Sequence, residues 1–418
     1  MDRQNNPGSR FCAAGVRSLL AVTCAVLGTL SCTGSADDSH ANTVALGLLL
    51  PYSGNDAGMA VNFEWAAELA VEHVNAAGGI RGKRLRLVGA DTHSRVDRGK
   101  QSAKFLIDEG AVAVLGMESS DIAQEVEPTF FEHDVALISP VVGTADDTGV
   151  GCTSRWFRLA PSAKTMGEAL AKQMIASHVP TIAVLSTPDA YSKAFGNSLA
   201  KRFKSLGGTV ALQTELDPTA VSYGEVLEQV TASGASDVVL SAPVTTAAWV
   251  ASEAYLTFRS PMNWYLSPLL KTDQLIQNAV PGALDGAKGV APKPFETEDA
   301  FARVFENRAH DLPMEGAYFY FDAVVLAAYA LQLASSADGG AVSAEAFKDA
   351  LMTIARPVGF TTTWAELDEG LEGIAQNRSV YYTGLTGPMQ FDACGVRKIA
   401  AFSSWSIRAG RIVSETGT

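Results

Sequence analysis

Short apolar runs of strand length alternate along the chain with segments of helical periodicity. This alternation is typical of a parallel sheet whose strands are joined by crossover helices and buried on both faces. One series of runs precedes about residue 160 and a second follows it, which predicts two lobes of similar build. The predicted strands are Val44–Leu50, Leu85–Val88, Ala111–Leu115 and Val135–Ile138, then Ile182–Leu185, Val210–Leu212, Val238–Leu240 and Trp264–Leu266.

The helices between these strands carry recognisable faces and stop signals. Five residues of the first helix are spaced at i, i+3, i+4, i+7 and i+8, which places them on one face of the helix. They are Ala66, Leu69, Ala70, His73 and Val74. Gly78-Gly79 supplies residues that adopt positive φ and end this helix, and Gly207-Gly208 ends a helix over Ala194–Leu206 in the same way.

The C-terminal third contains too few elements for a third domain. It predicts helices over Asp322–Ala334 and Ala344–Ile354, and a late strand pair formed by Met389–Asp392 and Ile399–Ile407. We expect these pieces to complete the two lobes, so that the chain crosses between them several times.

Composition and charge exclude two broad classes of protein. A chain of 418 residues with 47% hydrophobic and 18% charged residues is not intrinsically disordered. Its formal charge of −13 disfavours a nucleic-acid partner, because that binding depends on Lys and Arg neutralising phosphates.

The first 31 residues have the order of an export signal. Arg10 and Arg17 precede a mostly apolar run, Leu19 to Leu30, which is too short to span a bilayer. The run ends in a sequence that resembles a bacterial lipobox, which predicts lipidation of Cys32 and a linker over residues 32–43. Ordinary cleavage after Ala36 and a buried N-terminal helix are the alternatives. The residue after Cys32 is Thr33 and not the Asp that typically retains a lipoprotein in the inner membrane, so an outer-membrane anchor is a further alternative.

Cysteine usage agrees with export. Cys12 and Cys24 would leave with the signal, so Cys152 and Cys394 remain as one even pair in an oxidising compartment. We expect a disulfide between them; two separate buried thiols are the alternative.

The sequence lacks the motifs of common catalytic and metal sites. Its six histidines are scattered, without His-x-x-x-His or Cys-x-x-Cys, and it contains no Gly-x-Ser-x-Gly nucleophile elbow or phosphate-binding loop. We therefore expect neither a catalytic residue nor a metal or cofactor.

Hydroxyl and glycine clusters instead follow three predicted strands, at the sheet edge where ligands bind in open α/β folds. These clusters contain Tyr52-Ser53-Gly54, Ser119-Ser120 and, after Ser139-Pro140, Gly143-Thr144. Hydroxyls and backbone amides at a helix start can bind a carboxylate without a basic side chain. Plain N-capping of the following helices is the alternative.

Several segments, in order along residues 44–413, make the chain resemble the type I periplasmic binding proteins that serve branched-chain amino acid (Leu/Ile/Val) ABC transporters. They are Gly47 to Gly54, Asn75 to Lys83, Ala113 to Gly116, Leu137 to Pro140, Tyr318 to Ala323 and Gly384 to Asp392.

The resemblance implies an α/β clamshell of two doubly wound parallel-sheet lobes, joined by three hinge crossovers, which closes on a solute. It assigns residues 44–160 and 291–397 to the first lobe, and residues 161–290 and 398–418 to the second. It also places Cys152 and Cys394 on the first lobe's edge near the hinges.

The same resemblance implies a set of ligand-binding residues. They are Tyr52, Ser53, Ser119, Ser120, Gly143 and Thr144 from the first lobe, Tyr191 closing over the ligand from the second, and Tyr318 lining the side-chain pocket.

Two positions depart from the family pattern. Family members that bind amino acids supply carboxylates for the ammonium group, but this chain reads Ser162-Ala163-Lys164-Thr165 and Ser267-Pro268-Leu269-Leu270 there. A buried ammonium without a paired charge costs several kcal/mol, so a free α-amino acid should bind poorly. A carboxylate or amide without that amine, or an apolar molecule reached by Leu269 and Leu270, is expected instead.

The resemblance thus predicts a non-enzymatic solute-binding protein of the periplasm or cell envelope, anchored to a membrane through its N-terminal lipid. It would capture a small polar solute and present it to an ABC permease. A sensing or regulatory envelope lipoprotein on the same clamshell is the alternative.

Overall fold

The first sheet is buried on both faces because its strands place alternate apolar residues on opposite sides. The computed structural model describes residues 42–54, 56–142, 155–258, 262–292, 298–335, 341–398 and 402–415. Within β1 (Thr43–Leu50), Leu46, Leu48 and Leu50 join one hydrophobic core, whereas Ala45 and Leu49 join another. Both faces of the sheet are therefore covered by helices, as a parallel sheet requires.

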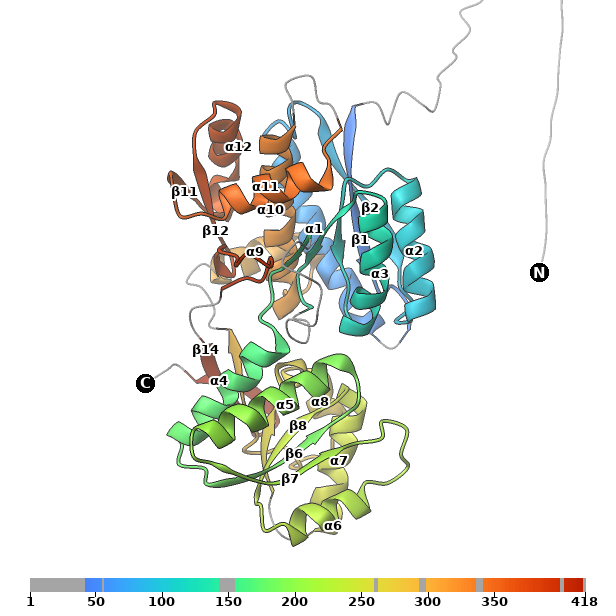
Figure 1. Cartoon of the computed structure of the whole chain (residues 1–418), viewed down its shortest axis with the longest axis vertical. Coiled ribbons are helices and arrows are strands. Elements are labelled where there is room, and N and C mark those ends of the chain that lie inside the picture. Colours follow the sequence, from blue (N-terminus) through green and yellow to red (C-terminus); the bar gives the residue numbers. More distant parts are fainter. Residues whose placement is uncertain are drawn as a thin grey trace, which may run out of the picture. The chain divides into compact units, whose positions relative to one another are not determined.

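The first sheet contains the described strands β1, β2 (Arg84–Asp91), β3 (Ala113–Gly116), β4 (Ala136–Ser139) and β5 (Trp156–Arg158). Their spatial order is β2-β1-β3-β4-β5, and every pairing is parallel. Figure 1 shows α2 (Val96–Asp108) and α3 (Ser120–Glu132) along one face of this sheet. The other face is covered by α1 (Ala57–Ala76) and by helices from much later in the chain.

The later elements around this sheet are α9 (Glu298–Ala309), α10 (Glu315–Ala334), α11 (Ala344–Ile354), η2 (Trp364–Glu366) and α12 (Leu367–Ala375), with a small sheet of β11 (Phe360–Thr362), β12 (Val380–Gly384) and β13 (Gly387–Pro388). The helix α10 is long and apolar enough to span a membrane by composition alone. Since 83% of that window is buried inside the protein, α10 is accounted for as the central core helix.

The second sheet has the order β15-β14-β10-β9-β8-β6-β7. Its strands are β6 (Thr181–Ser186), β7 (Thr209–Glu215), β8 (Asp237–Ser241), β9 (Asn263–Leu266), β10 (Lys288–Pro292), β14 (Phe402–Arg408) and β15 (Arg411–Glu415). The strands β14 and β15 are antiparallel to their neighbours, whereas the others run parallel.

Helices cover both faces of the second sheet as well. In β8, Val238 and Leu240 join one core and Val239 joins the opposite core. The first core includes residues of α6 (Gly224–Ala232), α7 (Val244–Thr257), η1 (Pro268–Leu270) and α8 (Asp273–Asn278). The second includes residues of α4 (Ala163–Ala176) and α5 (Ala190–Ser205). The chain enters these elements after β5, leaves them after β10, and returns for β14 and β15.

The eight predicted strands of the two series are confirmed, with ends that differ by a few residues. The helix stops are also confirmed at Gly78, Gly79 and Gly207, whose φ angles are 100°, 72° and 92°, whereas Gly208 lacks a positive φ. The helix predicted from Asp322 begins earlier, at Glu315, and the one predicted from Ala194 begins at Ala190.

Of the late strand pair, Met389–Asp392 was predicted wrongly, whereas Ile399–Ile407 is confirmed as β14 over its described residues. Met389–Asp392 forms no strand, because the Asp392 carboxylate accepts hydrogen bonds from the amides of Cys394 and Val396, both at 2.9 Å, and so closes a turn. The strand β14 pairs instead with β10 and β15. The short strands β5, β10 and β12 had no clear signal in the apolar pattern.

Candidate functional site

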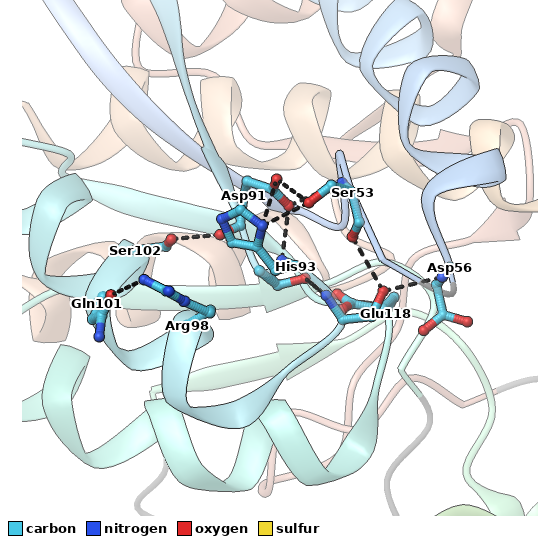
Figure 2. Close-up of polar contacts among 10 residues, drawn as sticks. Ser53, Asp56, Asp91, His93, Arg98, Gln101, Ser102 and Glu118 are labelled. Atoms are coloured by element: carbon cyan, nitrogen blue, oxygen red, sulfur yellow. Dashed lines mark hydrogen bonds and ion pairs between the residues drawn. The ribbon is translucent and has the colours of Figure 1, made fainter.

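The carboxyl ends of β1, β2 and β3 bring three loops to one edge of the first sheet. In the parallel register Leu50 lies opposite Asp91, and Leu49 lies opposite Gly116. The residues that follow these strands are polar and form a connected network, part of which is drawn in Figure 2. Ligands in open α/β folds bind at this type of edge.

Asp91 holds the first two loops together. Its Oδ2 accepts from the Ser53 hydroxyl at 2.8 Å, and its Oδ1 accepts from the amides of Ser53 and His93 at 3.1 and 2.8 Å (Figure 2). Burial alone would raise the pKa of Asp91, but these hydrogen bonds and the nearby His93 lower it below its ordinary value. Asp91 is therefore a charged anchor of the loops.

Ser53, His93 and Asp91 do not form a nucleophilic triad. A triad uses both ring nitrogens of the histidine, one toward the serine and one toward the carboxylate. Here the same nitrogen, His93 Nδ1, lies 2.6 Å from Ser53 Oγ and 3.3 Å from Asp91 Oδ2. The Ser53 hydroxyl already donates its proton to Asp91, so this geometry does not activate Ser53.

A second set of hydrogen bonds joins the loops after β1 and β2. The Asp56 amide donates to Ser94 Oγ at 3.0 Å, and the Ser94 amide donates to Thr92 Oγ1 at 3.2 Å. Burial raises the pKa of Asp56, while the contact with Ser94 lowers it in part.

Glu118 lies in the loop after β3, and only one of its two carboxylate oxygens has a hydrogen-bond partner among the described residues. Its Oε1 accepts from the Thr92 hydroxyl at 2.6 Å, whereas Oε2 is buried and has no hydrogen-bond partner among the described residues. Burial raises its pKa to about 7; the Thr92 hydrogen bond opposes this rise, and the charges of Asp56 and Asp91 add to it. The backbone before it is unusual, since Met117 has a φ of 98°.

The charge of the Glu118 carboxylate acts on Tyr320 of α10. Its ring stacks on Phe63 with centroids 4.8 Å apart, and the residue is 0% exposed. The Met117 backbone lies near its hydroxyl and lowers its pKa in part. Burial first, and then the charges of Glu118 and Tyr52, raise the pKa of Tyr320 well above its usual range.

Two of the predicted binding residues have other partners. The Tyr52 hydroxyl donates to Glu64 Oε1 of α1 at 2.7 Å, and burial raises the Tyr52 pKa. Ser53 is bound to Asp91 and His93, as described above.

The remaining first-lobe predictions divide into three cases. Ser119 caps α3 by accepting from the Asp121 amide at 3.2 Å, which agrees with the capping alternative. Ser120 is 7% exposed and makes no hydrogen bond through its hydroxyl within the described residues. Gly143 and Thr144 lie outside the described residues.

Tyr191 stands in the first turn of α5. Its ring stacks on Phe195, with centroids 6.4 Å apart, and stays partly exposed. Burial of its hydroxyl end and the charges of Asp189 and Glu315 raise its pKa. Asp189 caps the same helix by accepting from the Ser192 amide at 2.9 Å.

Tyr318 belongs to an aromatic cluster at the start of α10. Its ring lies 5.1 Å from that of Phe301, which in turn contacts Phe321 and Trp364.

The first turns of α3 and α5 approach each other. Partial desolvation raises the pKa of the Asp121 carboxyl in α3; the charge of Asp189 adds to this effect, and the Ala190 amide opposes it. The structure therefore brings the Ser120 and Tyr191 ends of two helices, from the two sheets, to neighbouring positions.

The two segments that lack the expected carboxylates begin with Ser162 and Ser267, and these two serines differ in their contacts. Ser162 caps α4 by accepting from the Thr165 amide at 3.1 Å. Ser267 is 0% exposed, and its hydroxyl has no partner among the described residues. Leu270 is buried, whereas Leu269 is 47% exposed.

Cys394 is in a disulfide. Its partner, like Cys152 and Cys32, lies outside the described residues, so the pairing with Cys152 stays a prediction. Lipidation of Cys32 stays one as well.

The described part of the chain offers no group of three or more potential metal ligands. A surface cavity of about 550 Å³ lies between α1, β2 and α9, lined by Glu68, Glu72, Arg84 and Arg308 among others. Arg308 is already paired with Glu72 and Glu68 at 3.1 and 2.9 Å, so its charge is neutralised within the protein. The carboxyl edge is the better candidate site.

Sequence reasoning assigned no role to Glu118 or Tyr320. A carboxylate between a fully apolar strand and a hydroxyl pair was a usable signal for Glu118. Tyr320 lies inside a largely apolar helix, and nothing in that pattern separates it from a core residue.

Comparison with known proteins agrees with this architecture. A family model described as "Periplasmic binding protein" matches residues 43–401. Leu/Ile/Val-binding protein homolog 3 of Brucella melitensis is 24% identical over 205 residues, which are 48% of this chain and 55% of that protein. The chain thus matches only about half the length of that relative.

Two solved structures share the fold over most of the chain. The leucine-binding protein LivK of Thermotoga maritima has a TM-score of 0.73 at 15% identity and covers 89% of this chain and 98% of its own. A solute-binding protein of an ABC transporter from R. palustris, in complex with 4-hydroxybenzoate, has a TM-score of 0.72 at 16% identity. It covers 89% of this chain and 95% of its own.

Proposed function

The chain belongs to the periplasmic binding protein family, and from this membership we propose that it captures a small polar solute outside the cytoplasm for an ABC importer. The solute would be amino acid-like, a carboxylate or an amide. It would be held between the two sheets and released to the permease. The protein would act by binding and closure and would not transform the solute.

The approach of the first turns of α3 and α5 carries this proposal. Helix N-termini carry a positive dipole end, which favours an anionic or carbonyl oxygen. Ser120 adds a hydroxyl without a protein partner, and Tyr191 adds a partly exposed aromatic ring.

Carboxylates at the same place refine the solute class. Asp121 is exposed, and Asp189 lies near it. They stand where a hydrogen-bond donor or an ammonium group of the solute could find a partner, although the two family positions lack a carboxylate. A solute with both an acceptor end and a donor end fits these groups best. The relatives named for leucine and 4-hydroxybenzoate fit such a solute class.

Ligand screening of the mature protein tests the proposal. Thermal unfolding would be followed with leucine, valine, threonine, benzoate, 4-hydroxybenzoate, butyrate and 4-hydroxybutyrate. A ligand present at 100 times its Kd should stabilise the protein by about 2.7 kcal/mol. Ser120→Ala should weaken binding of the solute that stabilises most, whereas Ser205→Ala, at the far end of α5, should not. The proposal is wrong if no solute shifts the unfolding temperature and native mass spectrometry of protein from its own host finds no captured molecule.

We also propose that the chain is exported through its first 31 residues and held at the membrane by lipid on Cys32. Fractionation tests this step, because Cys32→Ala should move the protein from the membrane fraction to the soluble periplasmic fraction. Loss of labelled solute uptake on deletion of the gene would separate delivery to a permease from a sensing role.

A further inference from the structure

The cavity between α1, β2 and α9 has the size of a small-ligand site. Its volume is about 550 Å³, and ligand pockets typically measure about 300–1,000 Å³. The residues that line it come from α1, from the first half of β2 and from the last turn of α9. None of them belongs to the site of the proposed function, so the cavity is a separate candidate.

Part of the lining is apolar. Leu85 is 2% exposed, and Val71 and Leu87 are partly buried against the same core. These side chains offer a surface on which an apolar side chain of a ligand can pack.

The polar part of the lining carries charges of both signs. Arg308 Nε lies 3.1 Å from Glu72 Oε1, and Arg308 Nη2 lies 2.9 Å from Glu68 Oε2. Two carboxylates thus share one guanidinium, and one negative charge remains in excess. Arg84 is exposed and has no ion-pair partner among the described residues.

The excess negative charge and Arg84 belong to opposite ends of the lining. The Asn75 side chain bonds the Leu85 amide at 2.8 Å and the Leu85 carbonyl at 2.9 Å, so this end of α1 lies beside the start of β2. Glu68 lies about two helical turns, or about 10 Å, before Asn75 on α1. A ligand that reaches both charges therefore spans about three residues of extended chain.

The strand β2 presents free backbone groups to this cavity. It is the edge strand of the first sheet over the described residues. The Leu85 amide and carbonyl point away from β1, because both are bonded by Asn75. Backbone groups alternate in direction along a strand, so those of Leu87 point the same way, and no strand lies beyond β2 to pair with them.

We propose that this cavity binds a short extended peptide, of about three or four residues with free termini, antiparallel to β2. Its carboxylate binds Arg84, and its ammonium group binds the carboxylates of Glu68 and Glu72. A central residue exchanges two backbone hydrogen bonds with Leu87, and the apolar side chain of that residue packs against Val71. The inference goes beyond the proposed function and does not rest on it.

Calorimetric titration with the tripeptide Val-Leu-Val tests the site. Amidation of its carboxyl terminus should weaken binding about tenfold, because a charge-assisted hydrogen bond is lost. Acetylation of its amino terminus should weaken binding as well. Methylation of the Leu amide nitrogen should weaken binding about fivefold, because the donor to the Leu87 carbonyl is removed.

Variants assign each end of the peptide to its partner. Arg84→Met should remove the difference between the free and the amidated peptide. Glu68→Gln leaves one carboxylate for Arg308, so it should remove the effect of acetylation. Arg98→Met is the matched control: Arg98 is an exposed arginine of α2 that does not line the cavity, and its loss should preserve both differences.

The outcomes distinguish this site from the site of the proposed function. Ser120→Ala should leave the affinity for Val-Leu-Val unchanged, and a loss of binding in that variant would place the peptide at the other site and overturn the proposal. Absence of binding at about 1 mM peptide would overturn it too. So would equal binding of the free and amidated peptides, or a difference that survives Arg84→Met.

Discussion

Lys271 Nζ lies 2.9 Å from Glu315 Oε2. Lys271 directly follows η1, whose Leu270 is buried in a core of the second sheet, and Glu315 begins α10, the central helix around the first sheet. The lysine side chain is 18% exposed and the glutamate side chain 48%, so solvent screens the pair only in part. The contact therefore ties together elements that pack against different sheets.

Breaking this ion pair should weaken solute binding more than it weakens the fold. Lys271→Met and Glu315→Gln should each lower the affinity several-fold, and a double-mutant cycle should give a coupling of about 0.5–1 kcal/mol. Titration calorimetry of the four proteins measures the coupling. The exposed pair Lys104 and Asp108 on α2 is the control, and its removal should leave affinity unchanged. Zero coupling would contradict a role in closure.

Glu118 should make the protein less stable as the pH rises from about 4.5 to about 7. The folded protein holds the Glu118 proton up to a pKa of about 7, whereas the unfolded chain releases it near 4.5. Stability is therefore fully present below pH 4.5 and is lost as the pH rises through 7.

Glu118→Gln should abolish that loss, with a gain at pH 8 of about 3 kcal/mol as an upper bound. Urea unfolding at several pH values measures the difference. Thr92→Val should extend the loss to higher pH, because the Thr92 hydrogen bond lowers the Glu118 pKa. Equal pH profiles for Glu118→Gln and the natural protein would exclude a buried, titrating Glu118.

Asp322 should be among the most sensitive positions for stability. Its buried carboxylate accepts from Tyr382 Oη at 2.7 Å, from the amides of Leu385 and Thr386 at 2.8 and 2.9 Å, and from Thr386 Oγ1 at 2.7 Å. Asp322→Ala leaves all these donors without a partner, and we expect a loss of about 3–5 kcal/mol.

Gly384→Ala offers an independent check on the same network. A Cβ at this position would clash with Asp322 Oδ1, so the carboxylate would have to move. The midpoint of urea unfolding should fall strongly for both variants, but not for Asp311→Ala on the exposed segment before α10. A Gly384→Ala protein of natural stability would contradict the close approach.

Cys394 should be found linked to Cys152 in the mature protein. Peptide mapping without reductant should yield one cross-linked pair, and Cys152→Ser together with Cys394→Ser should lower stability by about 2–5 kcal/mol. The Cys394 amide already donates to Asp392 at 2.9 Å, which fixes the turn that presents the sulfur. Free thiol at Cys394 in the oxidised protein would contradict the prediction.

The local pattern of apolar residues and glycines was sufficient to predict most of the strands and helix ends. Apolar runs such as Val44–Leu50 predicted strands because a strand buried on both faces has no polar position. Gly78 and Gly79 predicted the end of α1 because glycine, which has no Cβ, adopts a positive φ without steric cost. Met389–Asp392 failed because the turn at Asp392 depends on a side-chain hydrogen bond, which apolar patterning does not reveal.

The candidate site was predictable only in part. The sequence placed Ser119 and Ser120 at a strand end, but it could not separate the helix cap from the hydroxyl without a partner. Nor could it show that Tyr52 donates to Glu64, since that choice depends on how α1 packs over β1 and β2.

The sequence by itself determined the parallel strands of the two sheets, their helical cover and the resemblance to a solute-binding family, because each rests on periodicity or on motifs within a few residues. Only the tertiary structure decided that the Met117-Glu118 segment and Tyr320 interact. The physical reason is that they come from distant elements, a loop after β3 and the core helix α10. Their proximity is set by packing of whole helices against a sheet and leaves no trace in the local pattern of either segment.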